Sequence, residues 1–372
     1  MKYGIAVGLW MVALGACQVA TLPQVVDGRQ ERSASGLFER GALTVMTRGL
    51  SGGRNLERVL EGPLAEEPVR AAELLETLRE EDVLARAREL AEEIQYARPH
   101  LIGLQQVAQV RRQSPGDALF GGTQPAEALH LDVLPVLLGE LEARGLHYRE
   151  VARVRNADVE LPVLTGGAPA FDDVRVTDFD VILARADVEV QEGRAGNYVA
   201  RREVRRPGQE PVALPRGWAS VVAKVEGRKY RFVSTYLEPA PDEQGLRVQL
   251  AQAGELIRGL RGEPLPVVLV GDFNTPANLG LMGAPTYREL LLAGYVDVWT
   301  HRPGSTRPVG ADMPRELPSL AERLNLVLVR QPVAPGPRRM GPVLAYGVGG
   351  AWEERFGPWK PDLAGVVARL RM

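Results

Sequence analysis

The chain has 372 residues, and 45% of them are hydrophobic, which is enough for a sizeable buried core and excludes a disordered tail or a small disulfide-stapled scaffold. The 45 Lys and Arg residues nearly balance the 47 Asp and Glu residues, giving a formal net charge of −2. This balance gives no strong nucleic-acid signal, because proteins that bind nucleic acid at large carry a basic footprint.

The first 16 residues have the organisation of a secretory signal. Lys2 is followed from Gly4 by an apolar run of about thirteen residues, too short for a stable membrane-spanning helix. The run ends in Leu14-Gly15-Ala16 before Cys17, the only cysteine in the chain, and this arrangement resembles a bacterial lipobox. The resemblance implies a signal peptide over residues 1–16 and a lipid on Cys17. An uncleaved anchor, or an ordinary signal peptide with an incidental cysteine, is the alternative.

Lipidation would make Cys17 the membrane contact, since several acyl chains together anchor a protein stably. We expect a tether over residues 17–41, a single folded domain over residues 42–372, and an exported protein in the bacterial cell envelope. Gln18 is not the Asp that signals inner-membrane retention in some bacteria, which favours the outer membrane. A lone cysteine excludes an intramolecular disulfide and a multi-cysteine zinc site.

Apolar spacing predicts strands interleaved with helices. An apolar stripe over residues 83–97 predicts an amphipathic helix that Arg98-Pro99 ends. Further helices are predicted at about 125–143, 246–260 and 286–293. Strands are predicted at 42–46, 100–104, 148–154, 179–184, 218–225, 229–237, 266–270, 323–330, 343–348 and 365–370. This order predicts a layered α/β fold with a mixed sheet.

The most informative segment runs from Pro266 to Pro276, where an apolar strand ends in Gly271-Asp272-Phe273-Asn274. On the two-residue period of a strand, Asp272 and Asn274 point to the same side and can address one ligand. Asp and Asn also favour turns through their own hydrogen bonds. The tetrapeptide alone leaves both interpretations open.

A series of short segments, in order along the chain, resembles the endonuclease/exonuclease/phosphatase superfamily of metal-dependent phosphoesterases. The segments lie at residues 43–48, 99–105, 180–185, 232–239, 271–274, 295–299, 322–330 and 362–368. They span nearly the whole chain after the tether. The resemblance implies a DNase-like, four-layered α/β sandwich of two mixed β-sheets flanked by helices, with the site at one edge.

The resemblance also implies a Mg²⁺ ion held by an Asn after the first strand and a Glu after the second, together with two histidines and an Asp that orients one of them. Most of these positions are changed in this chain: the expected Asn is Gly49, the Glu is Gln106, the histidines are Tyr236 and Leu363, and the orienting Asp is Asn325. The acids and amides that remain are Asp272, Asn274 and Asp362, with Asp297 as a further acid nearby.

The changed residues remove chemistry while keeping shape. Mg²⁺ prefers carboxylate oxygens in an octahedral array, so Gly49 and Gln106 leave only Asp272 and Asp362 as candidate ligands of a weak site. Leu363 cannot transfer a proton, and a positioned acid or base contributes about 10² to 10⁴ in rate. Gln106 and Asn325 are near-isosteric with the acids they replace. The pattern favours a fold that is kept and a reaction that is lost.

Two functions stay open. The first is a catalytically inactive, lipid-anchored binding or surface module with no assigned cofactor or protein partner. A weaker extension of it is that the cleft still binds a phosphorylated small molecule or a lipid headgroup without cleaving it. The second is an active phosphodiesterase or phosphatase with a rewired site of Tyr236, Asp272 and Asp362, and with Mg²⁺ or Mn²⁺ as cofactor. The basic run at 202–206 is expected to be a solvated face.

Overall fold

The computed structural model describes residues 42–50, 56–165, 170–206, 208–278, 280–299, 307–308, 320–332, 344–347 and 365–370. Cys17, the expected signal peptide and tether, and the pair Asp362 and Leu363 lie outside these ranges. Within them, no helix has the length and apolar character needed to cross a membrane.

One mixed sheet, the first sheet, has seven strands among the described residues, in the order β16-β17-β1-β2-β5-β4, with β3 paired to β2. β1 and β2 run parallel, and the other pairs are antiparallel. The strands are β1 (Leu43–Gly49), β2 (Leu101–Gln113), β3 (Ala128–Asp132), β4 (Tyr148–Thr165), β5 (Ala170–Arg185), β16 (Leu344–Gly347) and β17 (Val366–Leu370).

The second sheet has six strands in the described part of the chain, in the order β12-β15-β11-β10-β9-β6. Here β10 and β11 run parallel, and the other pairs are antiparallel. Its strands are β6 (Glu189–Asn197), β9 (Gly217–Val225), β10 (Arg228–Tyr236), β11 (Val267–Asp272), β12 (Val296–Asp297) and β15 (Asn325–Arg330). Two short ribbons pair β7 (Arg202–Val204) with β8 (Val212–Leu214), and β13 (Arg307–Pro308) with β14 (Leu320–Glu322).

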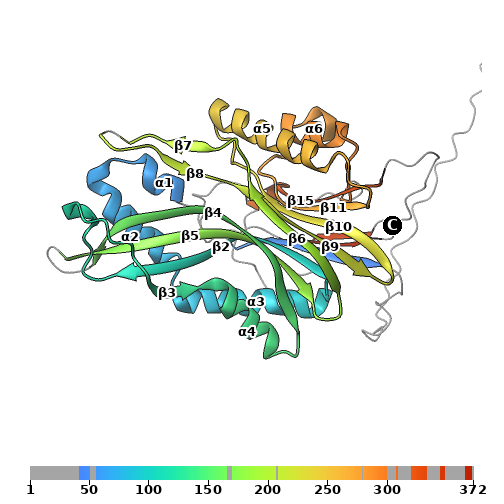
Figure 1. Cartoon of the computed structure of the whole chain (residues 1–372), viewed down its shortest axis with the longest axis horizontal. Helices are drawn as coiled ribbons and strands as arrows, with labels where there is room; N and C mark the ends of the chain where they lie inside the picture. Colours follow the sequence, from blue (N-terminus) through green and yellow to red (C-terminus); the bar gives the residue numbers. More distant parts are fainter. Residues whose placement is uncertain are drawn as a thin grey trace, which may run out of the picture. The chain divides into compact units, whose positions relative to one another are not determined.

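Three apolar clusters separate four layers. The first cluster lies between the first sheet and its helices, where Ile94 and Leu137 pack with Leu183. The second lies between the two sheets, and the third lies between the second sheet and its own helices. Figure 1 shows α3 and α4 against one sheet and α5 and α6 against the other. The helices are α1 (Leu56–Glu61), α2 (Glu67–Glu76), α3 (Glu80–Ala97), α4 (Val133–Glu142), α5 (Glu243–Leu260) and α6 (Pro285–Leu292). The predicted four-layered sandwich is confirmed.

One predicted helix is wrong in its first half. The segment at 125–143 was expected to be helical throughout, but residues 128–132 form β3, and α4 begins only at Val133. Asp132 explains the boundary, because its carboxylate accepts a hydrogen bond from the Leu134 N–H at 3.2 Å and so caps the helix. The helix over 80–97 ends as expected, with Arg98 in the left-handed conformation at φ 46°.

Two strands are much longer than the predicted 148–154 and 179–184. β4 and β5 pair as a long antiparallel ribbon that reaches Thr165 and Ala170. Their outer halves carry charged residues that the apolar pattern does not predict as strand. Cross-strand pairs compensate these charges: Arg175 donates to Asp158 at 2.6 and 2.8 Å.

Candidate functional site

The side chains that face the space between the sheets change from apolar to polar toward one end. On β10, every second residue faces inward, and the series runs from Phe232 through Ser234 to Tyr236. On β11 it runs from Val270 to Asp272. The five side chains are buried. The strand ends therefore bring polar groups to one end of the inter-sheet core.

Tyr236, Asp272 and Asn325 form a row across three neighbouring strands of the second sheet. Tyr236 lies opposite Asp272 in the register of β10 and β11. Asp272 in turn lies opposite Asn325 in the register of β11 and β15. Residues directly opposite each other have Cβ atoms roughly 5 Å apart. Three of the positions singled out in the sequence are thus neighbours.

Gln106 reaches this row from the first sheet. It occupies a bulge in β2 with a positive φ of 58°, and it is buried. Its side-chain amide donates a hydrogen bond to the phenolic oxygen of Tyr236 at 3.1 Å. Its backbone N–H donates to Asp180 Oδ1 at 3.3 Å. The residue at the expected Glu position is therefore neutral, buried and already hydrogen-bonded.

Gly49 lies at the same end. It is the last residue of β1 and pairs with Gln105, so the expected Asn position offers no side chain. Gln105 bridges the two sheets: its oxygen accepts from the Thr47 hydroxyl at 3.0 Å, and its amide donates to Ser234 Oγ at 2.9 Å. This bridge fixes the distance between the sheets beside the candidate site.

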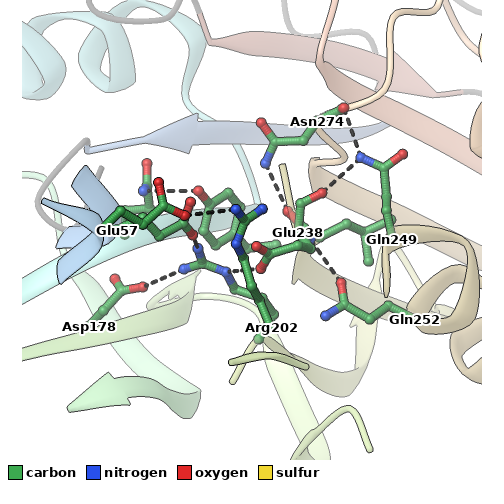
Figure 2. Close-up of polar contacts among 12 residues, drawn as sticks. Glu57, Asp178, Arg202, Glu238, Gln249, Gln252 and Asn274 are labelled. Carbon is green, nitrogen blue, oxygen red and sulfur yellow. Dashed lines mark hydrogen bonds and ion pairs between the residues drawn. The ribbon is translucent and has the colours of Figure 1, made fainter. Parts of the chain in front are cut away.

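Asn274 is tied to the backbone around it. Its N–H donates to Asp272 Oδ1 at 3.0 Å, and its side-chain amide donates to the Leu237 carbonyl at 2.8 Å. Its own carbonyl accepts from Gln249 Nε2 at 2.9 Å (Figure 2). The residue has φ 48°, a conformation that Asn tolerates better than most residues. The hydrogen bonds of Asn274 are therefore those expected if the tetrapeptide forms a turn.

Asp297 is held by a set of residues outside the strand-end row of Tyr236, Asp272 and Asn325. Its Oδ2 accepts from Tyr287 Oη at 2.7 Å and forms an ion pair with Arg323 at 2.5 Å. Its Oδ1 accepts from the Trp299 N–H at 3.0 Å. These contacts connect α6, β12 and the segment before β15, which is a structural role.

A buried charge cluster that the sequence patterns did not reveal lies beside Tyr236. Arg216, only 4% exposed, places its guanidinium 4.5 Å from the centre of the Tyr236 ring. It forms ion pairs with Glu238 at 3.1 Å, with Asp178 at 3.8 Å and with Glu57 of α1 (Figure 2). Burial raises the pKa of Asp178 and of Glu238 to about 7, and the charge of Arg216 opposes this shift. In the sequence, the signal for this cluster is a single arginine, Arg216, just before the apolar strand predicted at 218–225.

The expectation of a solvated face at 202–206 is wrong for two of its arginines. Arg202 is buried and pairs with Glu61 at 2.7 Å and Asp242 at 3.4 Å. Arg206 pairs with the buried Glu67 at 2.7 Å. Arg202 begins the short strand β7 and Arg206 lies two residues after its end. The acids that they contact belong to α1, to α2 and to the residue that caps α5, a partnership that composition alone does not reveal.

The described residues at the strand ends do not fit an octahedral Mg²⁺ site. Gly49 supplies no side-chain ligand, and Gln106 and Asn274 offer neutral amide oxygens, while their amide nitrogens donate to Tyr236 and to the Leu237 carbonyl. Asp272 is the only carboxylate in the row, and a hard cation takes several oxygen ligands. Within the described ranges, no group of three or more His, Cys, Asp or Glu is placed to hold a metal.

Comparison with known proteins finds one family and several solved folds. A model of the Endonuclease/Exonuclease/phosphatase family matches residues 62–346. A family protein from Leptotrichia buccalis is similar with a TM-score of 0.50 at 14% identity, over 89% of this chain and 100% of that one. A structure from Beutenbergia cavernae is similar with a TM-score of 0.52 at 17% identity, over 90% of this chain and 72% of that one. No curated protein matches at a significant level.

Proposed function

The chain belongs to the endonuclease/exonuclease/phosphatase family, and on this premise we propose that it keeps the family fold without the family's metal-assisted hydrolysis. We further propose that it acts as a lipid-anchored binding module in the bacterial envelope. One observation carries the inactive assignment: the Gln106 amide donates to Tyr236 at 3.1 Å in a buried setting. The position at which the family places a metal-binding carboxylate therefore carries a neutral amide that is hydrogen-bonded to Tyr236.

The charge of the row supports the same conclusion. Asn325, an amide, lies opposite Asp272 where an acid is expected, so Asp272 has neutral neighbours on both sides. Phosphoester hydrolysis of this class needs a cation to stabilise the charge that develops on the phosphate. A row with one carboxylate provides weak attraction for that cation. Tyr236 also stands where the family resemblance implies a histidine, and that histidine would transfer protons.

The rewired enzyme is less well supported. In that function Tyr236 would have to act as a base or nucleophile, which requires the phenolate. Burial raises the pKa of Tyr236 above its ordinary value, and the opposing charge of Arg216 is the smaller effect. The phenol is also buried and accepts a hydrogen bond from Gln106. A protonated, enclosed tyrosine is suited to packing and hydrogen bonding.

Hydrolysis assays test the inactive assignment. The full chain, purified in detergent, is incubated with Mg²⁺ or Mn²⁺ and with DNA, bis-nitrophenyl phosphate, sphingomyelin or inositol phosphates. We expect turnover equal to that of an Asp272→Ala control. Metal-dependent hydrolysis that Asp272→Ala abolishes would overturn the proposal and favour the rewired enzyme.

A reverted variant gives a positive control for the same assay. Gly49→Asn, Gln106→Glu, Tyr236→His, Asn325→Asp and Leu363→His together restore the residue types that the family resemblance implies. We expect this variant to gain Mg²⁺-dependent turnover that Asp272→Ala removes in the same background. A gain would show that the fold still supports the reaction once the side chains return.

The binding and anchoring parts need their own measurements. A phosphorylated small molecule or a lipid headgroup that binds the folded state should raise the melting temperature as its concentration rises. If no member of a phosphorylated panel does so, the ligand assignment fails. For the anchor, Cys17→Ser should abolish palmitate labelling and release the chain from the membrane fraction. Unchanged labelling would reject Cys17 as the lipid attachment site.

A further inference from the structure

Two β-bulges flank β5 at the same level of the first sheet. On one side, Gln105 and Gln106 of β2 lie opposite Asp180 alone. On the other side, Asn156 and Ala157 of β4 lie opposite Asp178 alone. A bulge inserts an extra residue and re-aims the side chains around it. Paired bulges on both sides of one strand concentrate polar side chains at this level.

Five polar atoms of the side chains at this level lack a hydrogen-bond partner. Asn156 is 2% exposed, Asp178 is 1% exposed and Asp180 is 0% exposed. Neither polar atom of the Asn156 side chain has a hydrogen-bond partner, and the same holds for both carboxylate oxygens of Asp178 and for Oδ2 of Asp180. A buried polar atom without a partner is costly, so such atoms in one place point to a missing ligand.

The two aspartates lie on the same face of β5, two residues apart, and point into the space between the sheets like Ile182 beyond them. Asn156 lies opposite Asp178 across the bulge of β4, so its amide belongs to the same level of the sheet as the two carboxyl groups. The cluster contains four oxygen atoms without a hydrogen bond, of which Asp178 Oδ2 is in an ion pair with Arg216 at 3.8 Å, and one amide nitrogen without a hydrogen bond, on Asn156.

The surrounding charge is also negative. Arg216 lies 3.8 Å from Asp178 in an ion pair, and it is shared with Glu238 and Glu57. The carboxyl groups of Asp178, Asp180, Glu238 and Glu57 outnumber the guanidinium groups of Arg216 and Arg202, the second of which interacts with Glu238 and Glu57. In a medium of low dielectric constant, this imbalance calls for further positive charge.

We propose that Asn156, Asp178 and Asp180 bind a buried divalent cation of the oxygen-liganded class, such as Ca²⁺, Mg²⁺ or Mn²⁺. One such ion can take oxygens from all three side chains at once, with water or backbone carbonyls completing its coordination. A shared proton bridges only two oxygens. The site is separate from the strand-end row of Asp272 and Asn325, and its role is to stabilise the first sheet.

Metal content and thermal unfolding test the proposal. The full chain is purified in detergent, unfolded in urea with a chelator, and refolded with Ca²⁺, Mg²⁺, Mn²⁺ or no cation. We expect one of the three to be retained after dialysis and to raise the melting temperature by several degrees. Asp180→Asn keeps the acceptor for the Gln106 N–H, but it should lose both the retained metal and the shift.

Two further variants separate the outcomes. Asn156→Ala removes only the amide ligand and should weaken metal retention at least several-fold. Asp272→Asn, in the strand-end row, should leave retention unchanged. The proposal is overturned if no cation shifts the wild-type melting temperature, or if Asp180→Asn raises it regardless of metal, which indicates a shared proton. It is also overturned if Asp272→Asn, rather than Asp180→Asn, abolishes retention.

Discussion

Gln106 and Tyr236 are 130 residues apart in the chain and belong to different sheets, and the side-chain amide of Gln106 donates a hydrogen bond to the Tyr236 phenol at 3.1 Å. In the family pattern these two positions carry a metal-binding acid and a histidine. Here they hold each other in a buried pair. Their hydrogen bond joins the two sheets at the end where the row of Tyr236, Asp272 and Asn325 lies.

Tyr236→Phe should destabilise the fold, because it leaves the buried Gln106 amide without its acceptor. An unsatisfied buried donor costs about 1–3 kcal/mol of unfolding free energy, measured by urea denaturation. The double variant Gln106→Met with Tyr236→Phe removes both partners and should cost less than the sum of the two single changes. Full additivity would contradict a direct coupling between the two side chains.

Gly103→Ala tests how closely the two sheets approach beside the site. A Cβ at Gly103 would lie 2.7 Å from both Ser234 Oγ and Val270 Cγ2, so the sheets would have to separate locally. Overpacking of this kind costs typically about 1–3 kcal/mol. The matched control is Gly139→Ala in α4, where a Cβ meets nothing within 4 Å. That change should stabilise the helix by about 0.5–1 kcal/mol.

If Gly103→Ala leaves the unfolding free energy unchanged while Gly139→Ala raises it, the sheets are not in close contact at Gly103. Guanidinium denaturation of the three chains under one set of conditions provides the comparison. A loss at Gly103 together with a gain at Gly139 is the expected pattern.

Arg216→Met should be among the most destabilising single changes in the chain. It leaves Glu238 and Asp178 buried without their countercharge, and breaking a buried pair in this way costs about 3–5 kcal/mol. Arg247→Met is the control, since its i,i+4 pair with Glu243 is exposed and its removal should change stability by less than about 0.5 kcal/mol. Equal losses of unfolding free energy in the two variants would show that Arg216 does not stabilise the buried acids around it.

Glu93→Gln should reduce the loss of stability at rising pH. Burial raises the pKa of Glu93 from 4.5 to about 7, against the smaller effect of Arg48. Between these values the folded chain keeps a proton that the unfolded chain releases. Stability therefore falls as pH rises, by about 1.4 kcal/mol per pH unit for this group.

Urea denaturation of both chains between pH 4.5 and 7 measures this difference. Burial lowers the pKa of His100 to about 4 and so acts in the opposite direction, but His100 is present in both chains. The difference between the two slopes therefore isolates Glu93. Identical slopes would place a charged, solvated carboxylate at this position.

The sequence predicted the architecture well, because each layer has its own periodic signal. The stripe over residues 83–97 and the apolar strand before Asp272 correspond to α3 and β11. The long ribbon of β4 and β5 was only partly predicted, since its outer half is stabilised by pairs such as Arg175 with Asp158. Cross-strand pairing is not visible in the local pattern of either strand.

The candidate site was predicted in part for a similar reason. Family resemblance pointed to Gln106, Tyr236, Asp272 and Asn325, and register and hydrogen bonds make them neighbours. The Arg216 cluster and the two bulges around β5 were not predicted. The bulges depend on extra residues in one strand of a pair, and the cluster depends on partners from distant elements. A strand period describes only one strand at a time.

The rate of Mg²⁺-dependent hydrolysis of bis-nitrophenyl phosphate by the wild-type chain, beside the Asp272→Ala chain, tests the central claim most directly. We expect the two rates to be equal at every Mg²⁺ concentration, because the strand-end row lacks the ligands and the proton-transfer group of the family. A wild-type rate that rises with Mg²⁺ and exceeds the Asp272→Ala rate would contradict the loss of the reaction.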